Sequence, residues 1–275
     1  MTSTTFHEVA EAIAPTFERR RAEFEEFCAP VRQWMLRELA PREGDTVLEL
    51  AAGVGETGFD AAVLIGERGR LISTELSPAM LDAARRRGAE RGIHNVEYRV
   101  VDAEQIELDG DSVDGVLCRF GYMLMDPQAA LAETRRVLRP GGRLTLAVWG
   151  TLERNLWLSN VALSLGQRGH IPPPEPPPAP GPFNLASAER ITELLRGAGF
   201  AKVRTEEVPL QLAVPDLDHH LALIADIAGP IALALRDLSE GDRAEVRAEV
   251  EDSLGRFTAR DGYELPGVAL CAAAG

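Results

Sequence analysis

The chain has few positive charges and almost no lysine. Among its 275 residues, Lys202 is the only lysine, and 29 basic residues stand against 43 acidic ones, so the net charge is −14 at neutral pH. The only runs of three basic residues, 19–21 and 85–87, lie close to acidic residues. A field of this sign repels DNA and RNA unless a local basic groove opposes it. We therefore expect a small-molecule partner and no nucleic acid.

Cysteines and long apolar runs are also scarce. Cys28, Cys118 and Cys271 are odd in number and far apart, so they predict neither a disulfide framework nor a metal site, and we interpret them as small core residues. No apolar run approaches the length of a membrane span, and the first residues lack the basic and apolar regions of a signal peptide. These absences predict a cytoplasmic protein without a membrane span. They make no prediction about the oligomeric state.

Strand and helix patterns alternate from residue 46 onward. We predict strands at 46–50, 70–75, 96–102, 113–118 and 143–149, with a turn at 140–142 before the last of them. Two helices are predicted to begin at Ser77-Pro78 and Asp126-Pro127, where a capping residue precedes a proline at the first helical position. This alternation predicts βαβ units and a mostly parallel sheet.

The other segments indicate helical additions to a single domain of 275 residues. Eight prolines between Pro172 and Pro182 indicate a stiff connector. The predicted parts are an N-terminal helical lid (1–40), a ligand-binding core (41–150), a helical and proline-rich insertion (151–186), and the last part of the sheet (187–275), which contains a helical insertion (216–256).

A glycine-rich turn joins the first predicted strand to a helix. Its pattern, Gly53-x-Gly55-x-x-Gly58, allows a tight turn and a close approach of the backbone to a ligand. Glu75 ends the second strand, 22 residues after Gly53, where a carboxylate accepts hydrogen bonds from both hydroxyls of a ribose. The pair indicates a cofactor that contains ribose, without deciding which one.

Three further features narrow the choice of cofactor. Glu49 lies at the end of the first strand, Asp102-Ala103 end the third, and a Leu-Arg-Pro-Gly-Gly-Arg-Leu run (138–144) precedes the fifth. Together with the glycine turn, they resemble the class I S-adenosylmethionine-dependent methyltransferases, in the broad group that includes the ubiquinone/menaquinone-type C-methyltransferases. The resemblance is strong over about 30–150 and weaker to about 210. It implies a Rossmann-like, doubly wound α/β sheet of seven strands, whose last strand is antiparallel.

The resemblance also implies roles for individual residues. Glu75 should hold the ribose, and Arg119 should lie near the sulfonium and the acceptor. The other implied contacts to S-adenosylmethionine are the methionine-side residues Glu49, Ala51, Ala52, Gly53, Gly55 and Thr57, and the adenine-side residues Leu76, Asp102 and Ala103. The family loop usually has glycine where this chain has Ala51. Because alanine resists a positive φ, either the backbone there keeps a negative φ or cofactor affinity falls.

The predicted reaction is methyl transfer to a small, largely apolar or aromatic acceptor, at carbon or oxygen in preference to nitrogen. A sulfonium already activates its methyl group, so proximity and orientation suffice without a catalytic triad, and we expect no metal. The segment 118–126 lacks the Asn/Asp-Pro-Pro-Tyr run of family members that methylate amino groups of bases or glutamine.

Several residues are candidates for the acceptor pocket or for a catalytic role. The substrate-binding candidates are Tyr122, Trp149, Arg154 and Trp157, and the catalytic candidates are Arg119, Tyr122, His7 and His170. Arg119 could instead pair with the N-terminal helices, Trp157 could pack between lid helices, and Met123 and Met125 could belong to the core. Two other functions stay open, namely an NAD(P)-dependent oxidoreductase and a non-catalytic module that binds S-adenosylmethionine.

Overall fold

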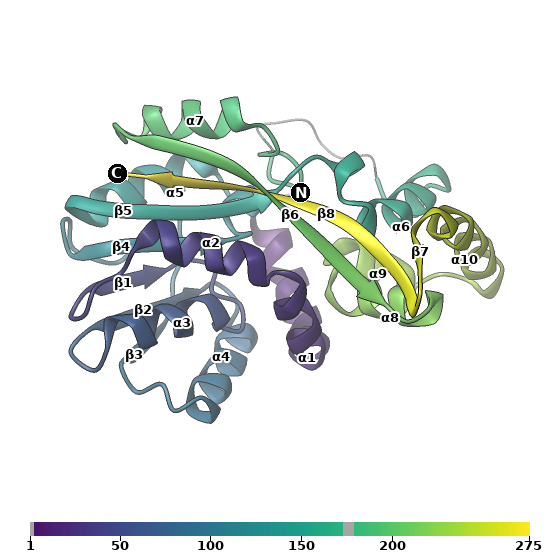
Figure 1. Cartoon of the computed structure of the whole chain (residues 1–275), viewed down its shortest axis with the longest axis horizontal. Coiled ribbons are helices and arrows are strands. Elements are labelled where there is room, and N and C mark those ends of the chain that lie inside the picture. Colours follow the sequence, from purple (N-terminus) through teal and green to yellow (C-terminus); the bar gives the residue numbers. More distant parts are fainter. Residues whose placement is uncertain (1–2, 173–178) are drawn as a thin grey trace.

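One twisted sheet runs through the computed structural model, which describes residues 3–172 and 179–275, with side chains from residue 7 onward (Figure 1). The strand order is β3-β2-β1-β4-β5-β8-β6. The parallel strands are β1 (Thr46–Glu49), β2 (Arg70–Glu75), β3 (Val96–Val100), β4 (Val113–Arg119) and β5 (Leu138–Trp149). Strand β8 (Gly262–Ala274) runs antiparallel between β5 and β6 (Val203–Val214), and the short β7 (Thr258–Ala259) pairs only with β8. The doubly wound sheet with an antiparallel last strand is thereby confirmed.

Helices cover both faces of this sheet. Helices α2 (Ala29–Leu39), α3 (Glu56–Ile65) and α4 (Pro78–Glu90) lie on one face, and α5 (Pro127–Val137) and α7 (Ala188–Gly197) lie on the other (Figure 1). Both predicted caps form, since the Ser77 hydroxyl accepts from the Met80 N–H at 3.1 Å and the Asp126 carboxylate accepts from the Gln128 N–H at 2.8 Å. The caps satisfy backbone donors that the first helical turn leaves unpaired.

The remaining helices gather beyond the carboxyl ends of the parallel strands. They are α1 (Ser3–Phe27), α6 (Leu156–Gln167), α8 (Leu217–Ile227), α9 (Pro230–Arg236) and α10 (Glu240–Leu254). A break before Pro230 separates α8 from α9 within the predicted helical insertion (216–256). Within the predicted lid of residues 1–40, only α1 reaches this edge, because α2 packs against β4, β5 and β8. The predicted proline-rich connector falls mostly on residues 173–178, which lie outside the described residues.

The predicted turn at 140–142 is wrong. These residues lie within β5, which begins at Leu138, and the pairing of β4 with β5 shifts register between Val113 and Gly115. Glycine fits such a bulge, because Gly141 has φ +83° and a Cβ on Gly142 would approach Leu138 Cδ2 to 2.9 Å.

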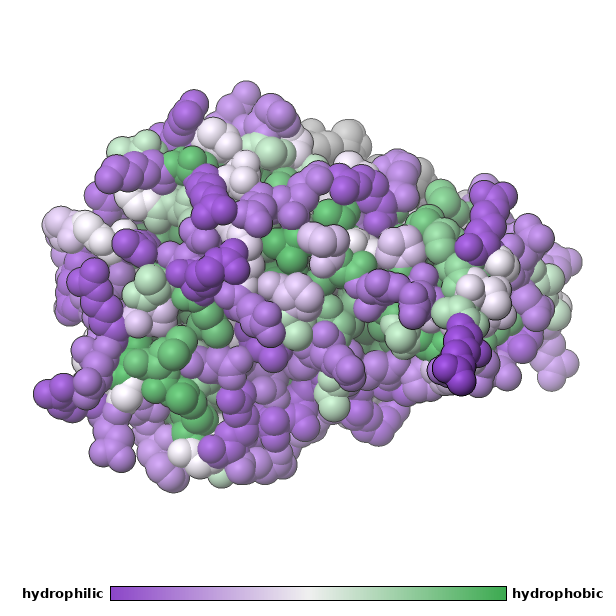
Figure 2. Space-filling view, viewed as in Figure 1, coloured by the Kyte–Doolittle hydropathy of each residue, from purple (hydrophilic) through white to green (hydrophobic). Residues whose placement is uncertain are grey.

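The outer surface is mostly hydrophilic on the face shown in Figure 2. An apolar patch on this face lies over α3, where Val63 and Leu64 are exposed. Among the described helices, none combines the length and the apolar run that a membrane crossing requires. Cys28, Cys118 and Cys271 are free and buried, as predicted for core residues.

Candidate active site

A cavity of about 310 Å³ lies at the carboxyl ends of the parallel strands. Its floor consists of residues at or just after the ends of β1 to β5. Helix α1 closes it with residues His7, Val9, Ala10, Ile13, Phe17 and Phe24, and the α8–α9 junction contributes 227–230. The carboxyl edge of an open parallel sheet is where ligands bind in this architecture.

The three glycines of the turn have different tasks. Gly53 has φ +54°, lines the cavity, and would have no atom within 4 Å of a Cβ. A Cβ on Gly55 would lie 2.5 Å from the Phe59 ring, and one on Gly58 would overlap the Glu49 carboxylate. Only Gly53 therefore exposes backbone to a ligand. The predicted cofactor contact of Gly55 is not supported, because this residue faces Phe59 and does not line the cavity.

Glu49 is buried beneath the turn. Its carboxylate accepts hydrogen bonds from the Gly58 N–H at 2.7 Å and from the Ser73 hydroxyl at 3.3 Å. Burial nevertheless raises the pKa of Glu49 to about 8, because these bonds only partly offset the loss of water. A cation entering the cavity would favour the ionised carboxylate.

Glu75 fixes the other side of the turn. Its carboxylate accepts from the N–H groups of Gly53 at 2.9 Å, Leu76 at 2.7 Å and Ser77 at 3.0 Å. The side chain lines the cavity, so its remaining lone pairs are placed to accept hydroxyl donors. The Thr57 hydroxyl also lines the cavity, and it is buried with no hydrogen-bond partner among the described residues. An orphaned hydroxyl of this kind fits a polar ligand group.

The cavity floor changes character along the sheet. Acidic residues lie at the ends of β1 and β2 and just beyond β3, where they are Glu49, Glu75 and Asp102. Arg119 and Phe120 follow at the end of β4, and Trp149 ends β5. The polar part therefore lies over β1–β3, and the aromatic part lies over β4 and β5.

Comparisons with known proteins agree with this arrangement. A family described as a methyltransferase domain matches residues 47–142. A demethylmenaquinone methyltransferase of Clavibacter sepedonicus is 37% identical over 116 residues, 42% of this chain and 45% of that protein. A ubiquinone/menaquinone biosynthesis C-methyltransferase of Francisella tularensis subsp. novicida is 33% identical over 105 residues, 38% of this chain and 42% of that protein. The chain thus spans less than half the length of these curated relatives.

A solved structure extends the likeness of fold to nearly the whole chain. Geranyl diphosphate C-methyltransferase from Streptomyces coelicolor aligns with a TM-score of 0.53 at 17% identity, covering 90% of this chain and 78% of that one. Residues 47–142 thus resemble a methyltransferase domain, and the chain shares the fold of this solved methyltransferase. The cofactor of this family is S-adenosylmethionine.

The fold gathers most of the residues that the family resemblance implied for the cofactor. With the exception of Gly55, these residues line the cavity: Glu49, Ala51, Ala52, Gly53, Thr57, Glu75, Leu76, Asp102, Ala103 and Arg119. Ala51 has φ +50°, so the backbone adopts the positive φ usual for the family's glycine in spite of the side chain. These placements are compatible with cofactor contacts, which stay predictions.

The acceptor and catalytic candidates divide into two groups. Trp149, Trp157 and His7 line the cavity, as do Met123 and Met125. Tyr122 is buried elsewhere, with its hydroxyl 2.5 Å from Thr134 Oγ1. Arg154 is exposed and pairs with Glu207.

His170 is a further candidate that does not line the cavity. It follows the carboxyl end of α6, where its Nε2 lies 3.6 Å from Asp242 Oδ1. The geometry does not support a role for Tyr122, Arg154 or His170 in the acceptor pocket or in catalysis, because none of the three lines the cavity.

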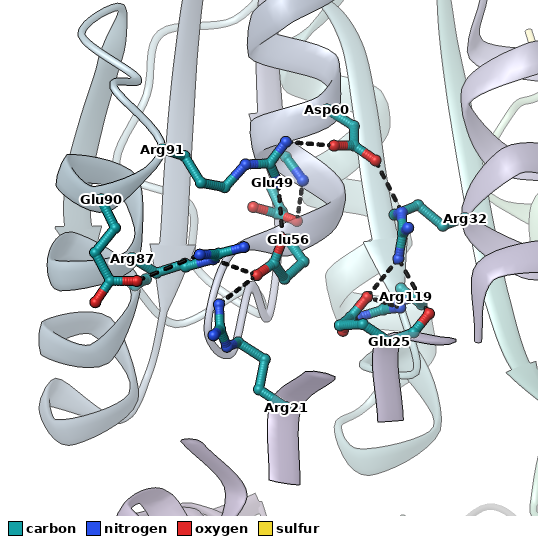
Figure 3. A network of polar contacts seen from close by, with 12 residues as sticks. Arg21, Glu25, Arg32, Glu49, Glu56, Asp60, Arg87, Glu90, Arg91 and Arg119 are labelled. Atoms are coloured by element: carbon teal, nitrogen blue, oxygen red, sulfur yellow. Dashed lines mark hydrogen bonds and ion pairs between the residues drawn. The ribbon is translucent and has the colours of Figure 1, made fainter. Parts of the chain in front are cut away.

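Arg119 pairs with the N-terminal helix, one of the two alternatives left open by the sequence. Its guanidinium forms a two-point ion pair with Glu25 of α1, with Nη1 at 2.9 Å from Oε2, and Arg32 of α2 contacts the same carboxylate at 2.7 Å (Figure 3). Arg119 is therefore neutralised before any ligand arrives.

A second acidic centre ties α1 to the glycine turn. Glu56, in the first turn of α3, binds Arg21 of α1 at 2.8 Å, Arg87 at 2.6 Å and Arg91 at 2.7 Å (Figure 3). Burial alone would raise the pKa of Glu56, but the three guanidinium groups outweigh it and hold the pKa below its usual range. Asp60 bridges Arg91 to Arg32, so the two centres form one network.

The sequence interpretation named Trp149 and Trp157 for the aromatic part of the wall but missed the rings that α1 contributes. The chain has nine Phe, three Tyr and three Trp, and six of these side chains form one connected cluster. Its members are Phe17, Phe24, Phe27, Phe120, Trp149 and Trp157, and all except Phe27 line the cavity. The repeat of apolar residues at 9, 13, 17 and 24 was an available signal for the contribution of α1.

Proposed function

We propose that this protein transfers a methyl group from S-adenosylmethionine to a small, largely apolar or aromatic acceptor, at carbon or oxygen in preference to nitrogen. The observation that carries the proposal is the division of the cavity floor. Acidic side chains at β1–β3 suit a cofactor with hydroxyl and amino groups, and aromatic side chains at β4 and β5 suit an acceptor with little charge. The curated relative from Clavibacter sepedonicus, named for demethylmenaquinone, supports an acceptor of this class.

The residues of the polar part fit the cofactor. Bound S-adenosylmethionine would supply a methyl group already activated on a sulfonium. Glu75 would accept from the ribose hydroxyls, and Asp102 would accept at the adenine edge. The open backbone at Gly53 and the orphaned Thr57 hydroxyl leave room and a polar partner for the methionine part.

The residues of the aromatic part favour an acceptor without net charge. Arg119 is already paired with Glu25, so an anionic acceptor would have to compete with a buried carboxylate. Aromatic and apolar walls exclude water and hold the acceptor in line with the methyl group, and such orientation can supply much of the rate enhancement. His7 is the only histidine among the lining residues, so we assign no general base at the acceptor end.

Calorimetry tests the cofactor assignment. We expect micromolar binding of S-adenosylhomocysteine and no binding of NAD(P)H. Glu75→Ala should weaken binding of S-adenosylhomocysteine by about 1–3 kcal/mol, because it removes charge-assisted hydrogen bonds. Glu67→Ala, at an exposed position on the loop between α3 and β2, is the matched control and should bind like the parent. Binding of NAD(P)H in place of S-adenosylhomocysteine would sink the proposal, and unchanged affinity in Glu75→Ala would show that the ribose lies elsewhere.

Turnover tests the reaction itself. Release of S-adenosylhomocysteine is measured with a panel of phenols, quinols and small acids, and we expect it with phenols or quinols. If the cofactor binds but no member of the panel promotes release, the non-catalytic binding module becomes the better description.

A further inference from the structure

Phe120 has a backbone conformation that a bulky residue rarely adopts. Its φ is +62°, in the left-handed region, where a Cβ crowds the neighbouring carbonyl. The other described non-glycine residues with positive φ are Ala40, Ala51 and Asp111, all with smaller side chains. Strain of this kind persists where the surrounding structure holds it, and it gathers at functional sites.

Folding alone does not require phenylalanine here. The Phe120 N–H continues the ladder between β4 and β5 by donating to the Ala147 carbonyl at 2.7 Å, and a glycine would make the same bond without strain. The ring is only partly buried, and it lines the cavity. The strained residue therefore presents an aromatic ring at the ligand site.

The chain around Phe120 fixes the direction of this ring. A Cβ on the next residue, Gly121, would lie 2.6 Å from both Ala51 Cβ and Cys118 Sγ. This close packing against the glycine turn anchors the exit from β4. Because the backbone that leaves β4 is held in place, its conformation fixes the position of the Phe120 ring.

The Phe120 ring presents a flat surface that a second aromatic ring backs. Phe120 stacks on Trp149 with centroids 3.8 Å apart and planes 14° apart. Trp157 and Phe24 meet Trp149 at 56° and 75°, so they stand as walls beside the stacked pair. A planar conjugated ring gains most from such a surface, because offset stacking needs two flat partners, whereas an aliphatic chain gains only burial.

We propose that Phe120 is a specificity-determining residue, which with Trp149 forms a stacking platform for a planar, conjugated ring of the acceptor. This inference rests on the proposed function and deepens it: the acceptor class becomes phenols or quinols, and saturated rings and aliphatic chains are disfavoured. The strain at Phe120 is retained because the platform needs an aromatic ring at this position.

Calorimetry on the protein loaded with S-adenosylhomocysteine tests the platform with two probes of matched size, 2-naphthol and its saturated counterpart decahydro-2-naphthol. We expect the parent to bind 2-naphthol about 10-fold more tightly, near the upper end of the strength of aromatic pairs. Phe120→Leu should reduce this ratio below about 3-fold, and Phe120→Tyr, which keeps the ring, should retain it. Phe257→Leu, which changes a phenylalanine outside the cavity, should behave as the parent.

Each outcome decides one question. Equal affinity of the parent for the two probes, or a ratio that survives in Phe120→Leu, would overturn the platform. Thermal melting of each variant detects a folding defect. Phe120→Gly, which removes the backbone strain, is a second variant that should stay folded but lose the preference for 2-naphthol over decahydro-2-naphthol. If S-adenosylhomocysteine binds and neither probe does, this inference fails while the cofactor assignment stands. If S-adenosylhomocysteine itself fails to bind, the proposed function fails.

Discussion

Ala51 shows how one residue of the cofactor turn departs from the family pattern without changing the turn. Its φ of +50° is the conformation for which the family uses glycine, and its Cβ packs over Gly121, which has no room for a Cβ of its own. The left-handed backbone at Ala51 is part of the folded turn, so we expect its strain to lower the stability of the fold and to leave the affinity for cofactor unchanged. The sequence had left a negative φ or a lower affinity as alternatives, and the structure excludes the first.

We therefore expect Ala51→Gly to stabilise the protein without changing its affinity for cofactor. Relief of the left-handed strain should exceed the entropic cost of glycine and raise the free energy of unfolding by about 1 kcal/mol. Ala40→Gly is the matched control, because Ala40 has φ +48° at the end of α2, outside the cavity. Urea unfolding and calorimetry with S-adenosylhomocysteine measure the two effects. A lower stability of Ala51→Gly, with Ala40→Gly stabilised, would show that the Cβ contact with Gly121 outweighs the strain.

The positions of single site residues were predictable where they follow directly from the ends of strands. Glu49, Glu75 and Asp102 could be placed because parallel strands bring their carboxyl ends to one edge. Gly55 does not line the cavity, because it faces the ring of Phe59, and no spacing rule shows which side of a turn a neighbouring ring fills. Tyr122 lies only three residues after Arg119 but turns into the core toward Thr134 through the 3₁₀ turn Tyr122–Leu124, which the sequence did not indicate.

Among the described helices, α1 contributes the most residues to the cavity wall, and polar contacts add to the apolar packing that holds it to the rest of the protein. Arg21 binds Glu56, Glu25 binds Arg119, and on its other side α1 meets α8 through the 2.9 Å bond of Arg20 to Asp226. We expect a ligand as large as S-adenosylmethionine to enter beneath α1 and to displace some of these contacts. The helix itself was predictable from its apolar spacing, but its partners lie 35 to 206 residues away along the chain, beyond any local pattern.

We expect Arg21→Gln to loosen α1 selectively. Glu56 keeps Arg87 and Arg91, so no buried carboxylate loses all its partners and global stability should change by less than about 1 kcal/mol. Loss of a contact of that strength should speed dissociation of S-adenosylhomocysteine about 5-fold and raise amide exchange within α1.

Stopped-flow dissociation and hydrogen exchange measure these changes. Arg85→Gln on the exposed face of α4, where Arg85 pairs with Asp82, serves as the control and should change neither. Unchanged exchange in α1 of Arg21→Gln would mean that the Arg21–Glu56 contact does not hold the helix.

At the scale of the whole molecule, the strand order separates the two halves of the proposed reaction. The order β3-β2-β1-β4-β5 puts the acidic strand ends side by side and the aromatic ones next to them, in the same two groups in which these residues follow one another along the chain. The sheet class was predictable from the βαβ rhythm, and so was the edge that binds ligands. The aromatic surface was not, because it combines β4, β5, α1 and α6, and it depends on how the additional helices pack over the edge.

The same burial that builds the site makes the stability of the whole molecule depend on pH. The pKa of Glu49 is raised to about 8 in the folded state by burial, and that of buried His220 is lowered to about 4 for the same reason. At pH values between the ordinary pKa of a carboxyl and that of an imidazole, Glu49 is protonated only in the folded state and His220 only in the unfolded state. The two states then bind the same number of these protons, so the two contributions to the pH dependence of stability cancel. Above about pH 6.5 the His220 imidazole is neutral in both states. Of these two groups, only Glu49 then makes stability depend on pH, because it binds a proton in the folded state and not in the unfolded state. Stability must then fall as pH rises.

We therefore expect the protein without cofactor to lose about 1 kcal/mol of unfolding free energy between pH 6.5 and 8, because the slope approaches its limit of about 1.4 kcal/mol per pH unit only between these two pH values. Glu49→Gln should remove this loss, because glutamine can accept from the Gly58 N–H without carrying a charge. Urea unfolding at pH 6.5, 7.25 and 8 measures the slope, and Glu67→Gln on the exposed loop should retain it. A loss that persists in Glu49→Gln would assign the slope to another group. Its absence from the parent would mean that Glu49 is already ionised in the folded protein, and that water or a counter-ion reaches the base of the cavity.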